Sequence, residues 1–358
     1  MFKYTVRRIL LAIPVLLGIL VVTFALGRMI PGDPCRAMLG EKATAEVCER
    51  FTEKFGLDKP IPVQFGIYMS QVLKGDFGDS IRFSRPVALI LIERLPTTIE
   101  LGALAILFAT LVGIPLGIFS AIKRNSPLDV STMTVANIGV SMPVYWLGLM
   151  LAYAFFLLKD TPFWLPPSGR LTAGVASIPF YEVWGIVAEP GTAKYFFLEF
   201  FSNLYFFNSI ITGDWKVFQD AAKHLILPAI ALATIPLAII ARMTRSSMLE
   251  VSKQDYIRTA KAKGLKNRLV IFRHALRNAL LPIVTIIGLE FGLIFAGALL
   301  TETIFGLSGV GRMLYDAITA RDFPIIQGFT LVIAAGYVIV NLIVDISYAF
   351  IDPRIKLE

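Results

Sequence analysis

The stretch "LGALAILFATLVGIPLGIFSAI", residues 101–122, decides the fold. Its 22 residues include no Asp, Glu, Lys or Arg. At about 1.5 Å per residue, a helix of this length crosses the ~30 Å hydrocarbon core of a bilayer. The whole chain of 358 residues is 56% hydrophobic, which does not suit two or three soluble domains. We therefore expect an integral membrane protein.

Further stretches of the same kind set the number of spans. Three more lack charged residues and are long enough to cross a bilayer: Ile9–Gly27, Val130–Leu158 and Phe323–Val344. Leu225–Ala241 is at the lower limit of length, and Asn278–Thr301 is interrupted only by Glu290. Six transmembrane helices is the simplest count, so we predict an all-α membrane protein.

The first span has some features of a cleavable signal peptide, because Lys3, Arg7 and Arg8 precede it. Its 19 uncharged residues are long for the apolar region of a signal. The sequence "GRMIPGDP" that follows also lacks a small-x-small cleavage site. We therefore predict a retained N-terminal helix.

The basic residues indicate the orientation of the chain. With the N-terminus in the cytoplasm, the inner segments hold 17 Lys and Arg against six acids, whereas the outer segments hold 17 against 19. Long outer segments cross regardless of charge, so the basic residues that flank the first span and fill the loop at 242–277 decide the orientation. We expect both termini in the cytoplasm. The chain then divides into an N-terminal transmembrane helix at 1–30, an extracytoplasmic segment at 31–95, two spans at 96–158, an aromatic-rich extracytoplasmic insertion at 159–224, and three spans with a cytoplasmic loop (242–278) at 225–358.

The chain contains two cysteines, Cys35 and Cys48, and both fall in the first outer segment. Outside the cytoplasm the environment permits disulfides, and a bridge closing so short a loop contributes roughly 3 kcal/mol. The alternative is two unpaired small residues. We predict the bridge, provided that the outward orientation holds.

The extracytoplasmic segments have helical patterns of their own. The stretches "EKATAEVCERFTEKFGLDKP" and "VQFGIYMSQVLKGDFG" each carry an apolar stripe, and the second suits a helix at the membrane interface. In the 159–224 insertion, eight of the 13 residues in "YFFLEFFSNLYFF" are aromatic. The uncharged run Phe200–Gly213 has only 14 residues, too few to span comfortably. We predict an interfacial helix or a packed cap there.

Proline and glycine also occur inside the second and third spans, in "VGIPLG" and "SMPVYWLG". Membrane helices tolerate them where neighbouring groups satisfy the freed backbone, and they mark kinks. Two interpretations remain open: bending during a functional movement, or an ordinary irregularity of packing.

The loop between the fourth and fifth spans contains "QDYIRTAKAKGLKNRLVIFRHALRN", residues 254–278, with seven Lys and Arg and one acid. Its first half predicts a short amphipathic helix that ends at Gly264, and its second half predicts another. Two such helices form a knob whose apolar anchors and basic rim suit a groove on a partner protein. The apolar positions are Tyr256, Ile257, Ala260 and Leu265 in the first helix and Leu269, Phe272 and Leu276 in the second.

Two other interpretations of this loop are weaker. Attraction to anionic lipid is worth ~1 kcal/mol per charge, but it does not require a glycine hinge or regular apolar positions. Nucleic-acid binding is disfavoured, because lipid headgroups occupy the same face and no nucleic-acid-binding fold surrounds the patch.

The loop resembles the "EAA" loop of ABC-importer permeases, which docks into a cleft on the ATPase subunit. The general pattern Glu-Ala-Ala-x3-Gly appears here as Arg258-Thr259-Ala260-x3-Gly264. Where Ile-x-Leu-Pro should follow, the chain has His274-Ala275-Leu276-Arg277, and proline comes only at Pro282. The form "DYIRTAKAKG...HALRNALLP" is similar to that of the dipeptide/oligopeptide/nickel permeases.

Other motifs agree with that subfamily and extend from residue 26 to 356, except for about 170–213. The long outer segment directly after the first span fits the B-type subunit best. The motifs are "LGRMIPGDP", "FGLDKPIPVQF", "GDFGDSI", "RLPTTIELG", "SMPVYWLG", "HLILPAIAL", "TETIFGLSGVGRMLYDAITARDFPIIQG" and "FIDPRIK".

The resemblance implies a type I (MetI-like) importer architecture in the inner membrane of a prokaryote. It implies a heterodimer with a second permease subunit, two cytoplasmic ATPase subunits and an extracytoplasmic substrate-binding protein. The cargo is expected to be a di- or oligopeptide, with a nickel chelate or a sugar left open. The chain has no GxxxxGK[ST] loop, so we expect no catalysis and no cofactor here, with ATP and Mg²⁺ on the partner subunits.

The same resemblance and the charge pattern select candidate functional residues. We expect the ATPase contact to be made by Tyr256, Arg258, Thr259, Ala260, Gly264 and Leu265, with Lys261 and Lys263 on the rim. Gly264 should matter most if its φ is positive or if its backbone approaches the partner closely.

Charged residues in or near the last spans are the other candidates. Glu290, the one acid well inside a span, either lines the substrate path or is a protonated or hydrogen-bonded residue that holds the permease pair together. A group near "GLSGVG" forms either an outer gate or binding-protein docking surface, or an ordinary solvated turn. For the acids and Arg354 at the end of the last span we favour mutual ion pairing. The "GLSGVG" group is Glu302, Arg312, Asp316, Arg321 and Asp322, and the terminal residues are Asp345, Asp352 and Arg354.

Two other function classes were weighed. A secondary transporter driven by an ion gradient is the main alternative, although the sequence shows no inverted repeat. A membrane-embedded enzyme would need a convergent polar site, and His224 and His274 have no partners at ligand spacing.

Overall fold

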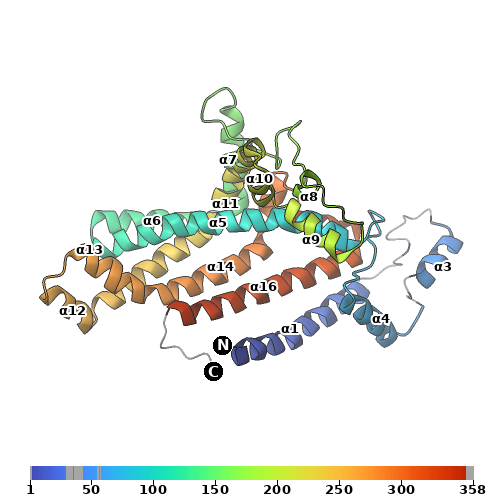
Figure 1. Ribbon diagram of the computed structural model, residues 1–358, viewed down its shortest axis with the longest axis horizontal. Coiled ribbons are helices and arrows are strands. Elements are labelled where there is room, and N and C mark those ends of the chain that lie inside the picture. Colours follow the sequence, from blue (N-terminus) through green and yellow to red (C-terminus); the bar gives the residue numbers. More distant parts are fainter. Residues whose placement is uncertain (1, 30–34, 36–42, 55, 57, 352–358) are drawn as a thin grey trace.

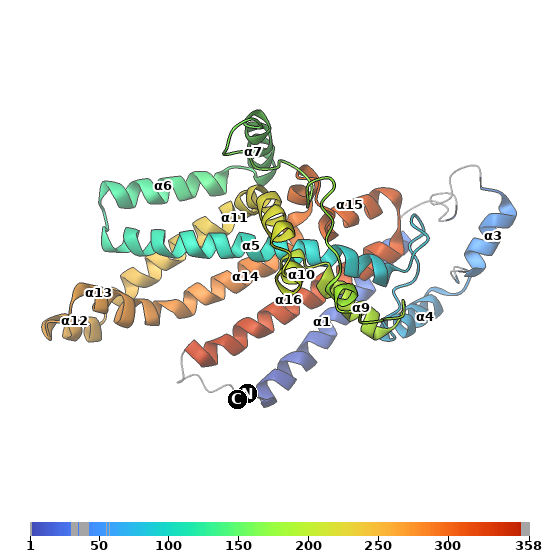
Figure 2. The same cartoon turned by 45° about the horizontal axis from the view of Figure 1, so that its top comes forward.

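The computed structural model describes residues 2–29, 35, 43–54, 56 and 58–351, and every extended regular element within these ranges is a helix. The predicted all-α membrane fold is confirmed. In Figures 1 and 2, α1, α5, α14 and α16 run roughly side by side. Within the described ranges, five helices are long and apolar enough to cross a bilayer: α1 (Phe2–Met29), α5 (Val87–Ile122), α11 (Trp215–Ser252), α14 (Leu276–Ile304) and α16 (Phe323–Ile351).

The third predicted span is broken. Val130–Leu158 was expected to form one helix, but the structure has α6 (Pro127–Ser141) and α7 (Val144–Leu157), bent by 98°. The cause is Pro143, which lacks an N–H and forces the preceding Met142 into an extended conformation (φ −81°, ψ 127°). Figure 1 shows α7 turned away from the direction of α6. Taken as one span, the two helices form an interrupted crossing and bring the number of candidate spans in the described residues to six.

Two helices are much longer than their charge-free cores. α5 begins at Val87 rather than at residue 101, and α11 has 38 residues where the sequence predicted the span Leu225–Ala241. Polar side chains at a helix end interrupt a hydrophobic run without interrupting the backbone hydrogen bonds. The cytoplasmic loop predicted from residue 242 therefore begins with about three turns of α11, which end at Ser252.

Glycines bring pairs of long helices into backbone contact. A Cβ placed on Gly117 of α5 would lie 2.6 Å from the carbonyl oxygen of Ala241 on α11, closer than real atoms approach. On α14, a Cβ at Gly288 would lie 2.0 Å from Cγ2 of Val344 on α16. Such small-residue contacts are typical of membrane helix packing. α5 also continues through Pro115 without a break.

The aromatic-rich insertion folds into short helices with a core of their own. They are α8 (Phe180–Val183), α9 (Ala193–Ser202) and α10 (Tyr205–Thr212). Phe180, Tyr181 and Leu198 are buried together, and the Tyr181 hydroxyl donates to Glu199 Oε2 at 2.7 Å. Burial, with Glu199 beside it, raises the pKa of Tyr181 above its usual value. Of the two predicted forms, the packed cap fits these contacts.

The segment after α1 is anchored to the end of that helix. α3 (Ala45–Lys54) and α4 (Ile61–Leu73) are the two helices expected there. The ring of Phe24 on α1 packs against Phe65 and Tyr68 on α4, with centroids 5.3 and 5.9 Å apart. The structure joins Cys35 to Cys48, with an S–S distance of 1.99 Å and their Cα atoms 5.3 Å apart.

Candidate functional site

The knob, residues 254–278, begins with a short helix that ends on a glycine. α12 spans Asp255–Ala262, and after it Gly264 adopts a φ of 74°. The amide of Gly264 donates to the carbonyl of Lys261 at 3.0 Å, and the amide of Leu265 donates to that of Ala260 at 3.3 Å. This pair of bonds is a Schellman motif, which requires a left-handed residue at the position of Gly264. The glycine therefore fixes where Leu265 points.

One face of α12 holds the knob to the bundle. Ile257 and Ala260 are 1% and 6% exposed and belong to a buried cluster that also contains Ile118 of α5 and Met248 of α11. Burial of these apolar groups provides the attachment. Ala260 was expected among the partner-contacting residues, but its methyl group faces this internal cluster.

The second predicted helix of the knob is continuous with the fifth span. Asn267–Leu269 forms a single turn (α13), Val270–Ala275 is π-helical, and α14 follows without a break. The wider π turn places both Val270 and Ala275 in the internal cluster. Leu269 and Phe272, predicted as apolar anchors for a partner's groove, lie on the outside of the knob.

The outer face of the knob is therefore apolar as well as basic. We define the knob surface as the four large exposed apolar side chains Tyr256, Leu265, Leu269 and Phe272, which are 38–52% exposed. Basic side chains surround them and are exposed too: Arg258, Lys261, Lys263, Lys266, Arg268, Arg273 and Arg277. Exposed apolar residues ringed by charge are typical of a protein interface. Thr259 is exposed, and its hydroxyl donates to the carbonyl of Asp255 at 3.0 Å.

Glu290 lies within the subunit. It is 8% exposed, and buried residues before and after it on α14, Ile283 and Ile294, belong to the internal clusters of the chain. The side chain is thus covered by this chain's own helices rather than displayed on an open face.

Glu302 is a buried helix cap and not a solvated residue. Its carboxylate accepts hydrogen bonds from Oγ1 of Thr98 at 2.6 Å and from the amide of Arg312 at 3.0 Å. Thr98 Oγ1 in turn accepts from the amide of Val310 at 2.9 Å. The carboxylate therefore offsets the partial positive charge at the N-terminus of α15 (Val310–Ala320). Through Thr98 it also ties that helix to α5.

Asp322 lies just beyond the other end of α15 and also ties distant parts of the chain together. It is 1% exposed and accepts from Oγ of Ser80 at 2.6 Å and from the amide of Arg82 at 3.1 Å. Arg312 and Asp316 are half-buried, and only Arg321 of the five predicted residues is exposed. The five therefore do not share one surface, either as a gate or as a solvated turn, since Glu302 and Asp322 hold the fold together from inside.

The sequence interpretation missed a buried ion pair that anchors the insertion. Arg170 donates to Glu100 of α5 at 2.7 Å, and its guanidinium lies 3.6 Å from the ring centroid of Tyr205. The amide of Phe206 donates to the other oxygen of Glu100 at 2.8 Å. Partners 70 residues apart leave no spacing signal that could have identified them.

Near the end of the last span, Asp345 pairs with Arg8 of α1 at 3.2 Å, and not with its sequence neighbours as expected. Asp352 and Arg354 lie outside the described residues.

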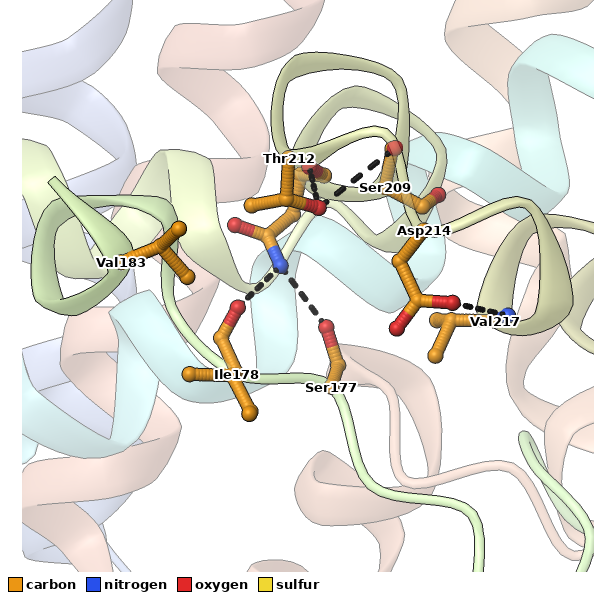
Figure 3. Close-up of a pocket in the computed structure, with 8 residues that line it drawn as sticks. Ser177, Ile178, Val183, Ser209, Thr212, Asp214 and Val217 are labelled. Carbon is orange, nitrogen blue, oxygen red and sulfur yellow. Dashed lines mark hydrogen bonds between the residues drawn. The ribbon is translucent and has the colours of Figure 1, made fainter.

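A pocket of about 140 Å³ lies within the insertion, between residues 177–183 and the start of α11 (Figure 3). The amide nitrogen of Asn208 donates to Ser177 and to the carbonyl of Ile178, and its oxygen accepts from Phe180. Asp214 accepts from the amide of Val217. These polar groups are engaged by the chain itself, so the pocket is part of the internal structure of the cap. Among the described residues, no three His, Cys, Asp or Glu side chains are grouped to hold a metal.

Comparison with known proteins gives matches along the whole chain. A family described as "Binding-protein-dependent transport system inner membrane component" matches residues 113–357, and its N-terminal counterpart matches residues 1–102. The chain is 45% identical to a dipeptide transport system permease protein, DppB, of Alkalihalophilus pseudofirmus, over 99% of this chain and 100% of that protein. It is 44% identical to the Escherichia coli K12 protein of that name, over 99% of each chain. It is 42% identical to a di/tripeptide transport system permease protein of Pseudomonas aeruginosa, again over 99% of each.

These matches also decide between the function classes. The family consists of components of binding-protein-dependent transport systems, so the alternative of a secondary transporter driven by an ion gradient is wrong. The family and the several apolar helices agree on a multi-pass protein of the inner membrane. The chain belongs to the family of binding-protein-dependent transport system inner membrane components.

Proposed function

We propose that this chain is the permease subunit of an ATP-driven peptide importer and forms half of its translocation path. The observation that carries the proposal is the full-length similarity to permeases named for dipeptide and di/tripeptide transport. The knob adds a site at which an ATPase subunit can act on the chain. Dipeptides and tripeptides are the favoured cargo.

The proposed assembly contains a second permease subunit, two ATPase subunits and an extracytoplasmic binding protein. ATP and Mg²⁺ bind to the ATPase subunits, and this chain catalyses no reaction. The knob and both termini face the cytoplasm in this proposal. The ion pair between Arg8 and Asp345 supports the placement of both termini on one side, because it joins the start of α1 to the last third of α16.

The knob has the two faces that a mechanical coupling requires. Tyr256, Leu265 and their apolar neighbours enter a groove on the ATPase subunit, where the surrounding Lys and Arg fix the orientation. Ile257 and Ala260 face the other way, into the buried cluster that also contains residues of α5 and α11. A movement of the ATPase subunit is thereby delivered to the long helices and not absorbed by a loose loop.

Reconstitution tests this function. Proteoliposomes that contain the complete assembly are supplied with the binding protein and a radiolabelled dipeptide, with ATP or without it on the ATPase side. We expect dipeptide uptake only when both ATP and the binding protein are present. Uptake driven by a proton or sodium gradient in the absence of ATP would contradict the proposal.

A further inference from the structure

A second buried ion pair lies beside the knob. Asp129, near the start of α6, is 3% exposed and receives four hydrogen bonds. Arg245 of α11 donates through Nε at 2.7 Å and through a terminal nitrogen at 2.8 Å, one to each carboxylate oxygen. Oγ of Ser120 at the end of α5 and the amide of Asn125 in the α5–α6 turn donate the other two. A two-pronged guanidinium–carboxylate contact fixes orientation as well as distance.

The pair lies on the same structural platform as the knob. Met248, one turn beyond Arg245 on α11, packs in the cluster that holds Ile257 and Ala260 of α12. Ile118 of α5, two residues before Ser120, packs in the same cluster. The hydrogen bonds of Asp129 therefore attach α6 to the helices that carry the knob.

α6 packs along α11 and α5, but few of its side chains are buried by them. Of its 15 residues, only Asp129 and Ala136 are buried. Its other polar contact with α11 is a weak one, from Arg242 to Asn137 at 3.5 Å. The helix ends after Ser141, and at Pro143 the chain turns by 98° into α7. Among the described polar contacts between α6 and α11, the pair of Asp129 and Arg245 is thus the one that is buried and two-pronged.

We propose that Asp129 and Arg245 form a positioning pair that makes α6 follow the knob, so that movement of the ATPase subunits is transmitted to the interrupted crossing α6–α7. This inference rests on the proposed function. The two residues touch neither the cargo nor the ATPase surface; they determine which helices move as one body. Loss of the contact between them should lower transport while ATP hydrolysis continues and the chain stays assembled.

The test uses the complete assembly in proteoliposomes and measures uptake and ATP hydrolysis together. With Asp129→Asn, we expect dipeptide uptake per ATP hydrolysed to fall about tenfold, while ATP hydrolysis continues. Arg245→Lys keeps the charge but loses the two-pronged contact, so it gives a smaller decrease and provides the test if Asp129→Asn does not assemble. The matched control is Asp345→Asn, which removes an ion pair between α1 and α16 and should leave uptake per ATP unchanged.

A distance measurement separates this inference from the proposed function. Spin labels are attached at Val135→Cys on α6 and Ser246→Cys on α11, both exposed positions. We expect the distance between the labels to be the same with and without ATP in the otherwise wild-type assembly, and to become nucleotide-dependent or broader in the Asp129 and Arg245 variants. Unchanged distances in these variants, or equal losses of uptake and ATP hydrolysis, would overturn the positioning role. A wild-type assembly without ATP-dependent uptake would instead contradict the proposed function.

Discussion

Replacing Gly117 with alanine is expected to lower the free energy of unfolding of the chain by about 1–3 kcal/mol, the usual cost of overpacking. The added methyl group would lie 2.5 Å from Cβ of Thr244 and 2.6 Å from the carbonyl oxygen of Ala241. A backbone atom cannot rotate away, so α5 and α11 must separate. These two helices carry the central core cluster, and the loss of packing spreads along both. Thermal unfolding of the purified chain in detergent measures the effect.

Gly336→Ala on α16 is the matched control for this variant. Nothing lies within 4 Å of a Cβ placed at Gly336, and both substitutions are made inside a long helix. Alanine is a better helix former than glycine by about 1 kcal/mol, so Gly336→Ala should leave stability unchanged or raise it. Opposite signs at the two positions support the close crossing of α5 and α11, and equal effects would contradict it.

Replacing Gly264 with valine is expected to reduce dipeptide uptake about tenfold, while the chain remains inserted and the ATPase subunits continue to hydrolyse ATP. There is open space around a Cβ at this position, so the effect comes from the backbone alone. A β-branched residue rarely adopts a φ of 74°, and leaving that conformation breaks the bond from Leu265 to Ala260. Leu265 then leaves the knob surface. Uptake and ATP hydrolysis are measured in the same proteoliposomes.

Gly264→Asn is the control, because asparagine tolerates the left-handed conformation. It should retain most of the uptake of the wild type. Normal transport by the valine variant, or an equal loss in both variants, would show that the conformation of Gly264 does not set the coupling.

The spans could be predicted because the bilayer imposes a length on charge-free runs, and of the six predicted runs all but Val130–Leu158 lie within single helices. The break at Pro143 could not, because prolines in membrane helices have different outcomes. α5 continues through Pro115, whereas the chain turns at Pro143. Whether neighbouring groups accommodate the missing hydrogen bond depends on packing that a single sequence does not contain.

The knob was located from its charge pattern, but the pattern did not separate its internal apolar residues from its exposed ones. Tyr256 and Ile257 are adjacent and both apolar, so the pattern does not say which of them faces inward. The π-helical turn after Leu269 then shifts the register that an α-helical interpretation assumes. Only the packing on Ile118 and Met248 shows that Ala260 is internal.

Charged residues were the least predictable part. Glu302 and Arg312 stood out as a possible exposed group, yet the carboxylate turns inward to cap α15. The contact between Asp129 and Arg245 was not predicted, because 116 residues separate the two in the sequence. Such pairs depend on how helices far apart in sequence meet, which local patterns do not determine.

The central claim is that the knob surface docks on the ATPase subunit, and photo-cross-linking tests it most directly. A photoreactive amino acid is placed at Leu265, and a second one at the exposed Val187 of the aromatic insertion serves as the control. The account predicts that the assembly gives a covalent adduct with the ATPase subunit from position 265 and none from position 187. An assembly in which position 265 yields no ATPase adduct, or reacts instead with the extracytoplasmic binding protein, would contradict it.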